Sequence, residues 1–91
     1  MNRVSREVRI TNQRGLHARA SAKFVGMASE LDADIEVEKD GNKVCGTSIM
    51  GLMMLGAAKG DTITISATGF GAEQAVERLC GLVEALFDEK Q

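Results

Sequence analysis

The side chains with the clearest chemical potential lie at the start of an expected helix. His17, the single histidine of the chain, follows a polar segment and precedes a run of residues typical of a helix. The first N–H groups of a helix have no intrahelical partner, and together with the helix dipole they favour anions. An imidazole at this place, with Arg19 two residues further on, has the parts of a nitrogen that accepts a phosphoryl group. We expect the backbone amides of Ala18 and Arg19 to bind the phosphate.

His17 has two other interpretations. A lone histidine near a helix start is, in most small domains, a surface residue or a helix cap. A histidine can also act as the general base of an enzyme, but that role needs a nucleophile or a second acid–base group within reach. The sequence contains no triad and no paired-carboxylate signature. Spacing alone therefore leaves a phosphoryl acceptor and a structural residue as the main alternatives.

Two motifs bear on this choice. Residues 15–19, with the letters GLHAR, resemble the active-site signature of the HPr family, the histidine-containing phosphocarriers of the bacterial phosphotransferase system. Residues 48–55, SIMGLMML, followed by AKGD at 58–61, resemble the second signature of that family, around its regulatory serine. The resemblance extends from about residue 8 to residue 86. By these two motifs the chain is identified as a member of the family.

The resemblance implies a phosphocarrier and not an enzyme. In the family, Nδ1 of the histidine accepts a phosphoryl group from Enzyme I, which draws it from phosphoenolpyruvate, and the carrier passes it to a IIA domain. His17 is then the transiently phosphorylated residue, and Arg19 stabilises charge in transit, since its planar guanidinium suits phosphate oxygens. No cofactor is implied. Both the sugar-transport branch and the nitrogen-related branch, in which partner proteins read the phosphorylation state, fit the sequence.

The chain departs from the family pattern at Ala20, where the family usually has proline. Proline is tolerated in the first turn of a helix because its missing N–H would have no intrahelical partner there. Alanine restores that N–H, and its high helix propensity still lets the helix form. We expect this change to affect the pattern of amides around the phosphate and to leave the carrier role intact.

The second motif implies a regulatory serine and a docking surface. Ser48 matches the serine that an ATP-dependent HPr kinase phosphorylates in many bacteria, and serine is also among the best helix caps. Residues 49–55 include too many apolar side chains for a short helix with one buried face, so some must be exposed. By the resemblance, Ile49, Met50 and Met53 lie near His17 and form the hydrophobic contact for Enzyme I. Exposed methionines suit a surface that binds several partners in turn.

Hydrophobic periodicity predicts the elements that position these residues. Alternating apolar residues indicate strands near residues 4–10, 35–38, 43–45 and 62–68, and helical spacing indicates helices after residue 17, over about 48–55 and over about 75–87. Asp40, Gly41 and Asn42 predict a hairpin between the second and third strands. Either Thr47 or Ser48 is expected to cap the second helix.

The predicted order is βαββαβα, which indicates an α+β fold. Every strand is apolar on one side only, so we expect a sheet with water on one face and helices on the other. The resemblance implies an open-faced two-layer sandwich, with a four-stranded antiparallel sheet of strand order 1-4-2-3 covered on one face by three helices. We expect a single HPr-like domain over residues 1–91.

Composition narrows the partners and the location. A net charge of −2 argues against nucleic acid, and the longest mainly apolar run, near residues 49–58, is too short for a membrane span. The first residues lack the apolar core of a signal peptide, so we expect a cytoplasmic protein. Cys45 and Cys80 match no zinc spacing, and we expect two small buried hydrophobic residues and no metal site. Nothing indicates a large apolar interface beyond the docking surface, so we expect a monomer.

Overall fold

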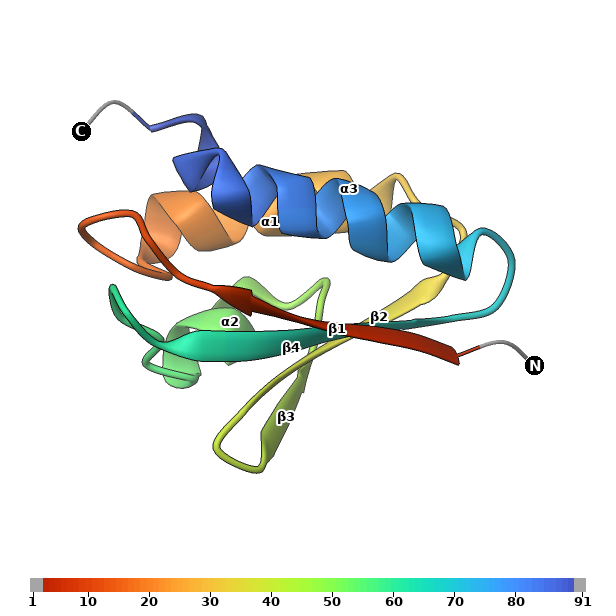
Figure 1. The fold of residues 1–91 in the computed structure, drawn as a ribbon, viewed down its shortest axis with the longest axis horizontal. Coiled ribbons are helices and arrows are strands. Elements are labelled where there is room, and N and C mark those ends of the chain that lie inside the picture. Colours follow the sequence, from red (N-terminus) through yellow and green to blue (C-terminus); the bar gives the residue numbers. More distant parts are fainter. Residues whose placement is uncertain (1–2, 90–91) are drawn as a thin grey trace.

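The computed structural model describes residues 3–89, which form a sheet packed against helices (Figure 1). The elements in chain order are β1 (Arg3–Arg9), α1 (Ala18–Ser29), β2 (Asp34–Lys39), β3 (Asn42–Cys45), α2 (Ile49–Met54), β4 (Thr62–Thr68), α3 (Ala72–Glu84) and the 3-10 helix η1 (Leu86–Asp88). This is the predicted βαββαβα order with one short helical turn added. Within the described residues, no helix has both the length and the apolar character that a membrane crossing requires.

The four strands form one antiparallel sheet with the order β1-β4-β2-β3, which confirms the implied 1-4-2-3 order. β4 lies between β1 and β2, with Ile63 opposite Val8 and Ile65 opposite Val37. Ile63 and Ile65 are fully buried, because both project from a central strand toward the face that the helices cover. Figure 1 shows α1 and α3 lying across this face, and the two helices contact each other.

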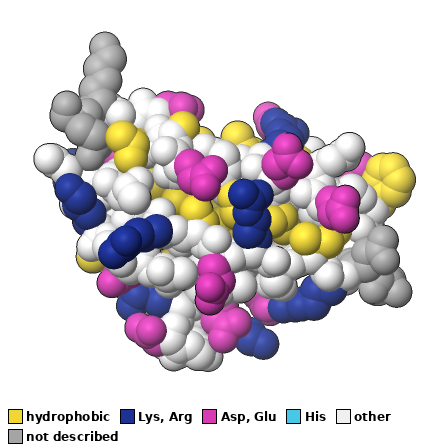
Figure 2. Space-filling view, viewed as in Figure 1, with side chains coloured by type: hydrophobic (Ala, Val, Ile, Leu, Met, Phe, Trp, Pro, Cys, Tyr) yellow, Lys and Arg dark blue, Asp and Glu magenta, His cyan; other side chains and the backbone are white. Residues whose placement is uncertain are grey.

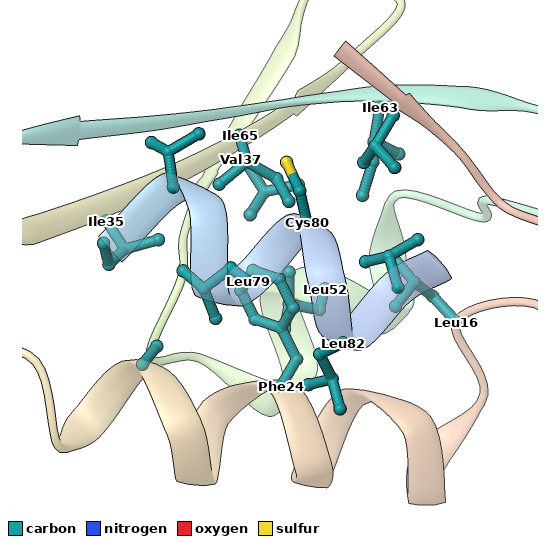
Figure 3. Packing of buried hydrophobic residues seen from close by; sticks show 14 of the residues in the cluster. Leu16, Phe24, Ile35, Val37, Leu52, Ile63, Ile65, Leu79, Cys80 and Leu82 are labelled. Carbon is teal, nitrogen blue, oxygen red and sulfur yellow. The ribbon is translucent and has the colours of Figure 1, made fainter. Parts of the chain in front are cut away.

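One apolar core joins the three helices to the sheet. Phe24 of α1, Leu52 of α2 and Leu79 of α3 are fully buried, and Figure 3 shows their side chains converging. α2 packs beside α1 and against β3, so Leu52 brings this short helix into the same layer. The opposite face of the sheet is polar, as predicted, and there the hydroxyls of Ser5 and Ser66 lie 2.8 Å apart across β1 and β4. The expected open-faced sandwich is confirmed.

The turns follow from the residue types that form them. The predicted hairpin connects β2 to β3, and its turn consists of Asp40 and Gly41, whose φ angles are 51° and 84°, since Asp-Gly tolerates this backbone. At the start of α2, the hydroxyl of Ser48 accepts a hydrogen bond from the backbone N–H of Gly51 at 2.9 Å. Of the two residues that were candidates for this role, Ser48 and not Thr47 caps the helix.

The last helix ends earlier than its periodicity predicts. α3 stops at Glu84, and Leu86, Phe87 and Asp88 have φ angles of 61°, 53° and 60°, in the left-handed region that residues other than glycine disfavour. Phe87 is nevertheless buried in the core, and Leu86 is half-buried. The apolar spacing at residues 86 and 87 thus indicates that these side chains contact the core. A turn can place them there as well as a helix can.

The prediction that both cysteines are buried is wrong for Cys45. Cys80 lies in the core as expected, but Cys45 is exposed at the end of β3. Its neighbour Val44 packs against the core, and successive side chains of a strand point to opposite faces. The sulfur of Cys45 lies 3.1 Å from the hydroxyl oxygen of Thr47, and hydrogen bonding to Thr47 lowers the pKa of the Cys45 thiol.

Candidate functional site

His17 occupies the position that precedes the first turn of α1. Its backbone is extended, with φ −76° and ψ −178°, and its carbonyl accepts a hydrogen bond from the N–H of Ser21 at 2.9 Å. Its imidazole makes no capping hydrogen bond to the first turn of the helix, so the ring is available for another role. The N–H groups of Ala18, Arg19 and Ala20 precede the first intrahelical bond and are placed to meet an anion.

The loop before His17 is pinned to the segment that follows α2. Gly15 has a φ of +63°, and a Cβ at this residue would lie 2.3 Å from the carbonyl oxygen of Ala57, so only glycine fits. The N–H of Leu16 donates to the same carbonyl at 2.9 Å, and the Leu16 side chain is buried. The start of α1 is therefore fixed beside the end of α2. Figure 1 shows the start of α1, α2 and η1 at the same end of the molecule.

A carboxylate from the C-terminal segment holds the imidazole ring. Oε2 of Glu89 lies 2.5 Å from Nε2 of His17, and Nδ2 of Asn12 donates to Oε1 of Glu89 at 2.9 Å. The same Nδ2 donates to the carbonyl of Gly15 at 2.9 Å, and Asn12 is fully buried. The side chains of His17 and Glu89 are only 16% and 14% exposed, so this pair is largely shielded from water.

The surroundings of Glu89 favour its ionised form. Burial is the largest single influence on its pKa and raises it, but the hydrogen bonds from Asn12 and His17 and the charges of His17 and Arg19 together outweigh burial. The pKa of the Glu89 carboxyl therefore lies below its usual value. An ionised carboxylate only accepts hydrogen bonds, and here both of its oxygens do so.

Basic side chains lie next to the His17–Glu89 pair. A hollow beside it is lined by Gln13, Arg14, Arg19, Lys23, Phe87, Asp88 and Glu89. Arg19 is exposed, and Nζ of Lys23 lies 3.4 Å from a carboxylate oxygen of Asp88. On the face drawn in Figure 2, by contrast, basic and acidic side chains are interspersed. The cluster of cations at the start of α1 favours an anion beside His17.

α2 presents an apolar surface at the same end of the molecule (Figure 1). The exposed fractions are 40% for Ile49, 68% for Met50, 41% for Met53 and 80% for Met54, whereas Leu52 is fully buried. Some apolar residues of this helix are thus exposed, as the sequence predicted, and they include the three docking candidates. Ser48 lies half-buried at the start of the same helix.

The start of α1 and α2, the two elements that carry the predicted site residues, lie at one end of the molecule (Figure 1), and the structure adds two residues to the site that the sequence did not reveal. Asn12 is one of several polar residues in its loop, and Glu89 is one of several acidic residues near the C-terminus, 72 positions from His17. No local spacing signals a contact between segments so far apart. Among residues 3–89, no group of three potential metal ligands lies together.

Comparison with known proteins assigns this arrangement to a family. The family model described as the phosphorylation site of the PTS HPr component matches residues 4–85. The chain belongs to the HPr family. Members of the HPr family are phosphocarrier proteins of the phosphotransferase system and not catalytic enzymes.

Relatives named NPr and HPr both resemble this chain. The phosphocarrier protein NPr of Shewanella violacea is 43% identical over 89 residues, which cover 98% of each chain. The crystal structure of HPr-C-His from Thermoanaerobacter tengcongensis is 43% identical and covers 100% of both chains, with a TM-score of 0.88. A crystal structure of an HPr dimer from the same organism is 45% identical, covers 90% of this chain and 94% of that chain, and has a TM-score of 0.76.

Proposed function

We propose that this protein carries a phosphoryl group on His17, accepting it from Enzyme I charged by phosphoenolpyruvate and passing it to IIA proteins. The observation that carries the proposal is the position of His17 at the start of α1, where its ring is held at Nε2 and backbone N–H groups meet incoming charge. Phosphoryl transfer requires mainly positioning and charge stabilisation. A small domain supplies both here, and its partners supply the rest.

The proposed transfer uses the second ring nitrogen of His17. Nδ1 forms a bond to phosphorus while the bond between phosphorus and its donor atom on Enzyme I breaks. The N–H groups of Ala18 and Arg19 and the guanidinium of Arg19 stabilise the phosphate oxygens, because charge-assisted hydrogen bonds are the stronger ones. Transfer to a IIA protein reverses these steps. Ala20 adds a third N–H to the first turn, which a proline would not provide.

Three of the exposed residues of α2 serve as the docking surface for Enzyme I in this proposal. Ile49, Met50 and Met53 are exposed, and the Leu16–Ala57 hydrogen bond fixes α2 beside the start of α1. Transient contacts of this kind are small and need not be tight. Flexible methionine side chains adapt to successive partners, so one surface can meet both the donor and the acceptor.

Ser48 gives this surface a means of regulation. Its hydroxyl already accepts the N–H of Gly51 at the start of α2. A phosphate on Ser48 meets the same favourable amides and therefore leaves the helix folded, but it adds about two negative charges beside Ile49 and Met50. We infer that an HPr kinase, where one is present, weakens docking of an acidic partner in this way.

A second candidate function rests on the similarity to the NPr of Shewanella violacea. In this alternative, partner proteins of the nitrogen-related branch read the phosphorylation state of His17, and no sugar is transported. The chemistry at His17 is the same in both cases. Incubating the phosphorylated protein with a IIA protein of each branch separates them, because the phosphoryl group moves faster to the cognate acceptor.

We further propose that the protein acts as a cytoplasmic monomer. The buried apolar residues of the described chain pack into one core, and the exposed large apolar residues are the four on α2 and Phe70. The HPr dimer from Thermoanaerobacter tengcongensis shows that a relative assembles in pairs. Light scattering across a concentration series tests the monomer directly, and a constant doubled mass contradicts it.

The carrier function is tested by incubating the protein with phosphoenolpyruvate, Mg²⁺ and Enzyme I of the same cell. Mass spectrometry is expected to find one added phosphoryl group that is labile in acid and stable in alkali. His17→Ala is the control, with its folding checked by circular dichroism, and it is expected to gain no such group. A folded wild-type protein that gains nothing from active Enzyme I overturns the proposal.

A further inference from the structure

We propose that Glu89, held in place by Asn12, is a positioning residue that keeps the proton of the His17 ring on Nε2 and so leaves Nδ1 as the attacking atom. The family resemblance implies that Nδ1 of His17 is the phosphorylated atom, and the contacts of this chain give that choice a physical cause. The inference deepens the proposed carrier function and rests on it for its catalytic consequence. Its structural part concerns the unphosphorylated protein and stands independently.

The Glu89 carboxylate is held in place by hydrogen bonds at both of its oxygens. Oε1 of Glu89 accepts a hydrogen bond from Nδ2 of Asn12 at 2.9 Å, and Oε2 lies 2.5 Å from Nε2 of His17. Asn12 is itself fixed, because its Nδ2 also donates to the carbonyl of Gly15 in a fully buried position. The carboxylate therefore has a defined position and a defined orientation toward the ring.

The hydrogen bond between Glu89 and His17 has a defined direction. The hydrogen bonds from Asn12 and His17 and the charges of His17 and Arg19 together outweigh burial and lower the pKa of Glu89, so the carboxylate is ionised at neutral pH. An ionised carboxylate has no proton to give, so Nε2 must be the donor. In a neutral imidazole only one nitrogen carries a proton, and the lone pair is then on Nδ1. Within residues 3–89, no hydrogen bond involves Nδ1.

Positive charge appears on the imidazole ring of His17 during phosphoryl transfer. When Nδ1 uses its lone pair to bond phosphorus, the ring acquires positive charge and the proton on Nε2 stays where it is. The Glu89 carboxylate already faces that proton, so it stabilises the developing charge without rearranging. No proton has to leave or arrive, and the return transfer to a IIA protein restores the neutral ring with the same hydrogen bond.

The path of the chain explains how Glu89 reaches the site. Phe87 is buried in the core, and three successive residues with left-handed backbone, 86–88, turn the chain back toward the start of α1. The N–H of Glu89 donates to the carbonyl of Leu86 at 2.9 Å and closes this turn. Disfavoured backbone at three residues in succession persists only where surrounding contacts hold it, and the anchor Phe87 and the Glu89 contacts provide them.

The structural part is tested by NMR on protein with ¹⁵N-labelled histidine, before any phosphorylation. Wild type is expected to show a single neutral tautomer protonated at Nε2 and a slowly exchanging Nε2–H signal. Glu89→Ala is expected to lose that signal and to give a mixture of tautomers. Asp88→Asn is the matched control, because this neighbouring carboxylate is exposed and pairs with Lys23, whereas Glu89 is the carboxylate that faces Nε2 of His17. A wild-type spectrum that Glu89→Ala leaves unchanged overturns the proposal.

The catalytic part is tested by the rate of phosphorylation by Enzyme I. Glu89→Gln is expected to lower kcat about tenfold, the size of one charge-assisted hydrogen bond, and to change KM less than about twofold, since α2 is untouched. Glu84→Gln, which changes an exposed carboxylate of α3 outside the hollow beside His17, is expected to match wild type. An unchanged kcat in Glu89→Gln contradicts the catalytic role. If wild type itself accepts no phosphoryl group, the carrier function fails while the NMR result still decides the position of the proton.

Discussion

At Gly15, two independent features exclude any side chain. The residue has a φ of +63°, and a Cβ would approach the carbonyl oxygen of Ala57 to 2.3 Å. We expect Gly15→Ala to lower the free energy of unfolding by at least about 2 kcal/mol, because it combines a left-handed backbone with a backbone clash. Urea unfolding measures the change.

A second glycine provides the matched control for this prediction. Gly26 lies in α1, and a Cβ there meets nothing within 4 Å. Gly26→Ala is therefore expected to stabilise the protein by about 0.5–1 kcal/mol, since alanine has the higher helix propensity. Equal effects of the two substitutions would show that the contact with Ala57 is not formed.

Thr47 and Ser48 are adjacent residues with hydroxyl groups, but their hydroxyls make different contacts. Ser48→Ala removes the hydrogen bond from the N–H of Gly51 and is expected to cost about 1 kcal/mol. Thr47→Ala removes only a contact with the exposed Cys45 and is expected to cost less than about 0.5 kcal/mol. Thermal or urea unfolding of both variants makes the comparison, and a larger loss in Thr47→Ala would contradict it.

On the scale of elements, the exposed side chains of α2 can be changed with little effect on stability, so their part in docking can be tested separately. Met50 and Met54 are both largely exposed, so a lysine at either residue is expected to change the free energy of unfolding by less than about 0.5 kcal/mol. Met50→Lys is expected to raise the KM of Enzyme I for this protein severalfold with kcat unchanged, since it puts a charge on the proposed contact. Met54→Lys, outside that contact, is the control. Equal KM values would remove Met50 from the docking surface.

The turn after α3 depends on one aromatic anchor. Phe87 is 1% exposed and Phe70 is 83% exposed, so the chain offers two phenylalanines in opposite environments. Phe87→Ala is expected to cost about 3–5 kcal/mol and to release Glu89 from His17, whereas Phe70→Ala is expected to cost less than about 0.5 kcal/mol. Urea unfolding gives the stability, and the Nε2–H signal of His17 reports the release. A retained signal in folded Phe87→Ala would show that the anchor is not needed.

On the scale of the whole molecule, the His17–Glu89–Asn12 contacts join both ends of the described chain and make stability depend on pH. The pKa of Glu89 in the folded protein lies below its usual value of 4.5. Its contribution to stability is therefore present above that usual value and is lost as the pH falls through the lowered pKa. We expect wild type to be more stable than Glu89→Gln at neutral pH and the difference to shrink below about pH 4.5.

Urea unfolding of wild type and Glu89→Gln across this pH range measures that difference. Asp88→Asn serves as the reference, because the Lys23–Asp88 pair is solvent-exposed and exposed pairs contribute little. A difference that grows as the pH falls would have the wrong sign for a carboxylate held in its ionised form.

The features that the sequence predicts correctly are those that depend on residues close together along the chain. The period of apolar residues gave the order of strands and helices, and Asp40-Gly41 gave the hairpin, because both depend on neighbours along the chain. Apolar spacing also predicted that the last helix continues through Leu86 and Phe87. This was wrong because the spacing reports burial and not backbone conformation. The sequence also led to the wrong prediction that Cys45 is buried, because composition does not say toward which face of an edge strand a side chain points.

The sequence by itself therefore determined the elements, the burial of the sheet on one side and the place of His17 at the start of a helix. The order of strands required the family resemblance, and the tertiary structure confirmed it. Only the tertiary structure decided that Asn12 and Glu89 meet His17, because this contact depends on how the left-handed turn at residues 86–88 and the buried Phe87 fold the chain back. Periodicity describes each segment separately, whereas a contact across 72 positions exists only once the segments have packed together.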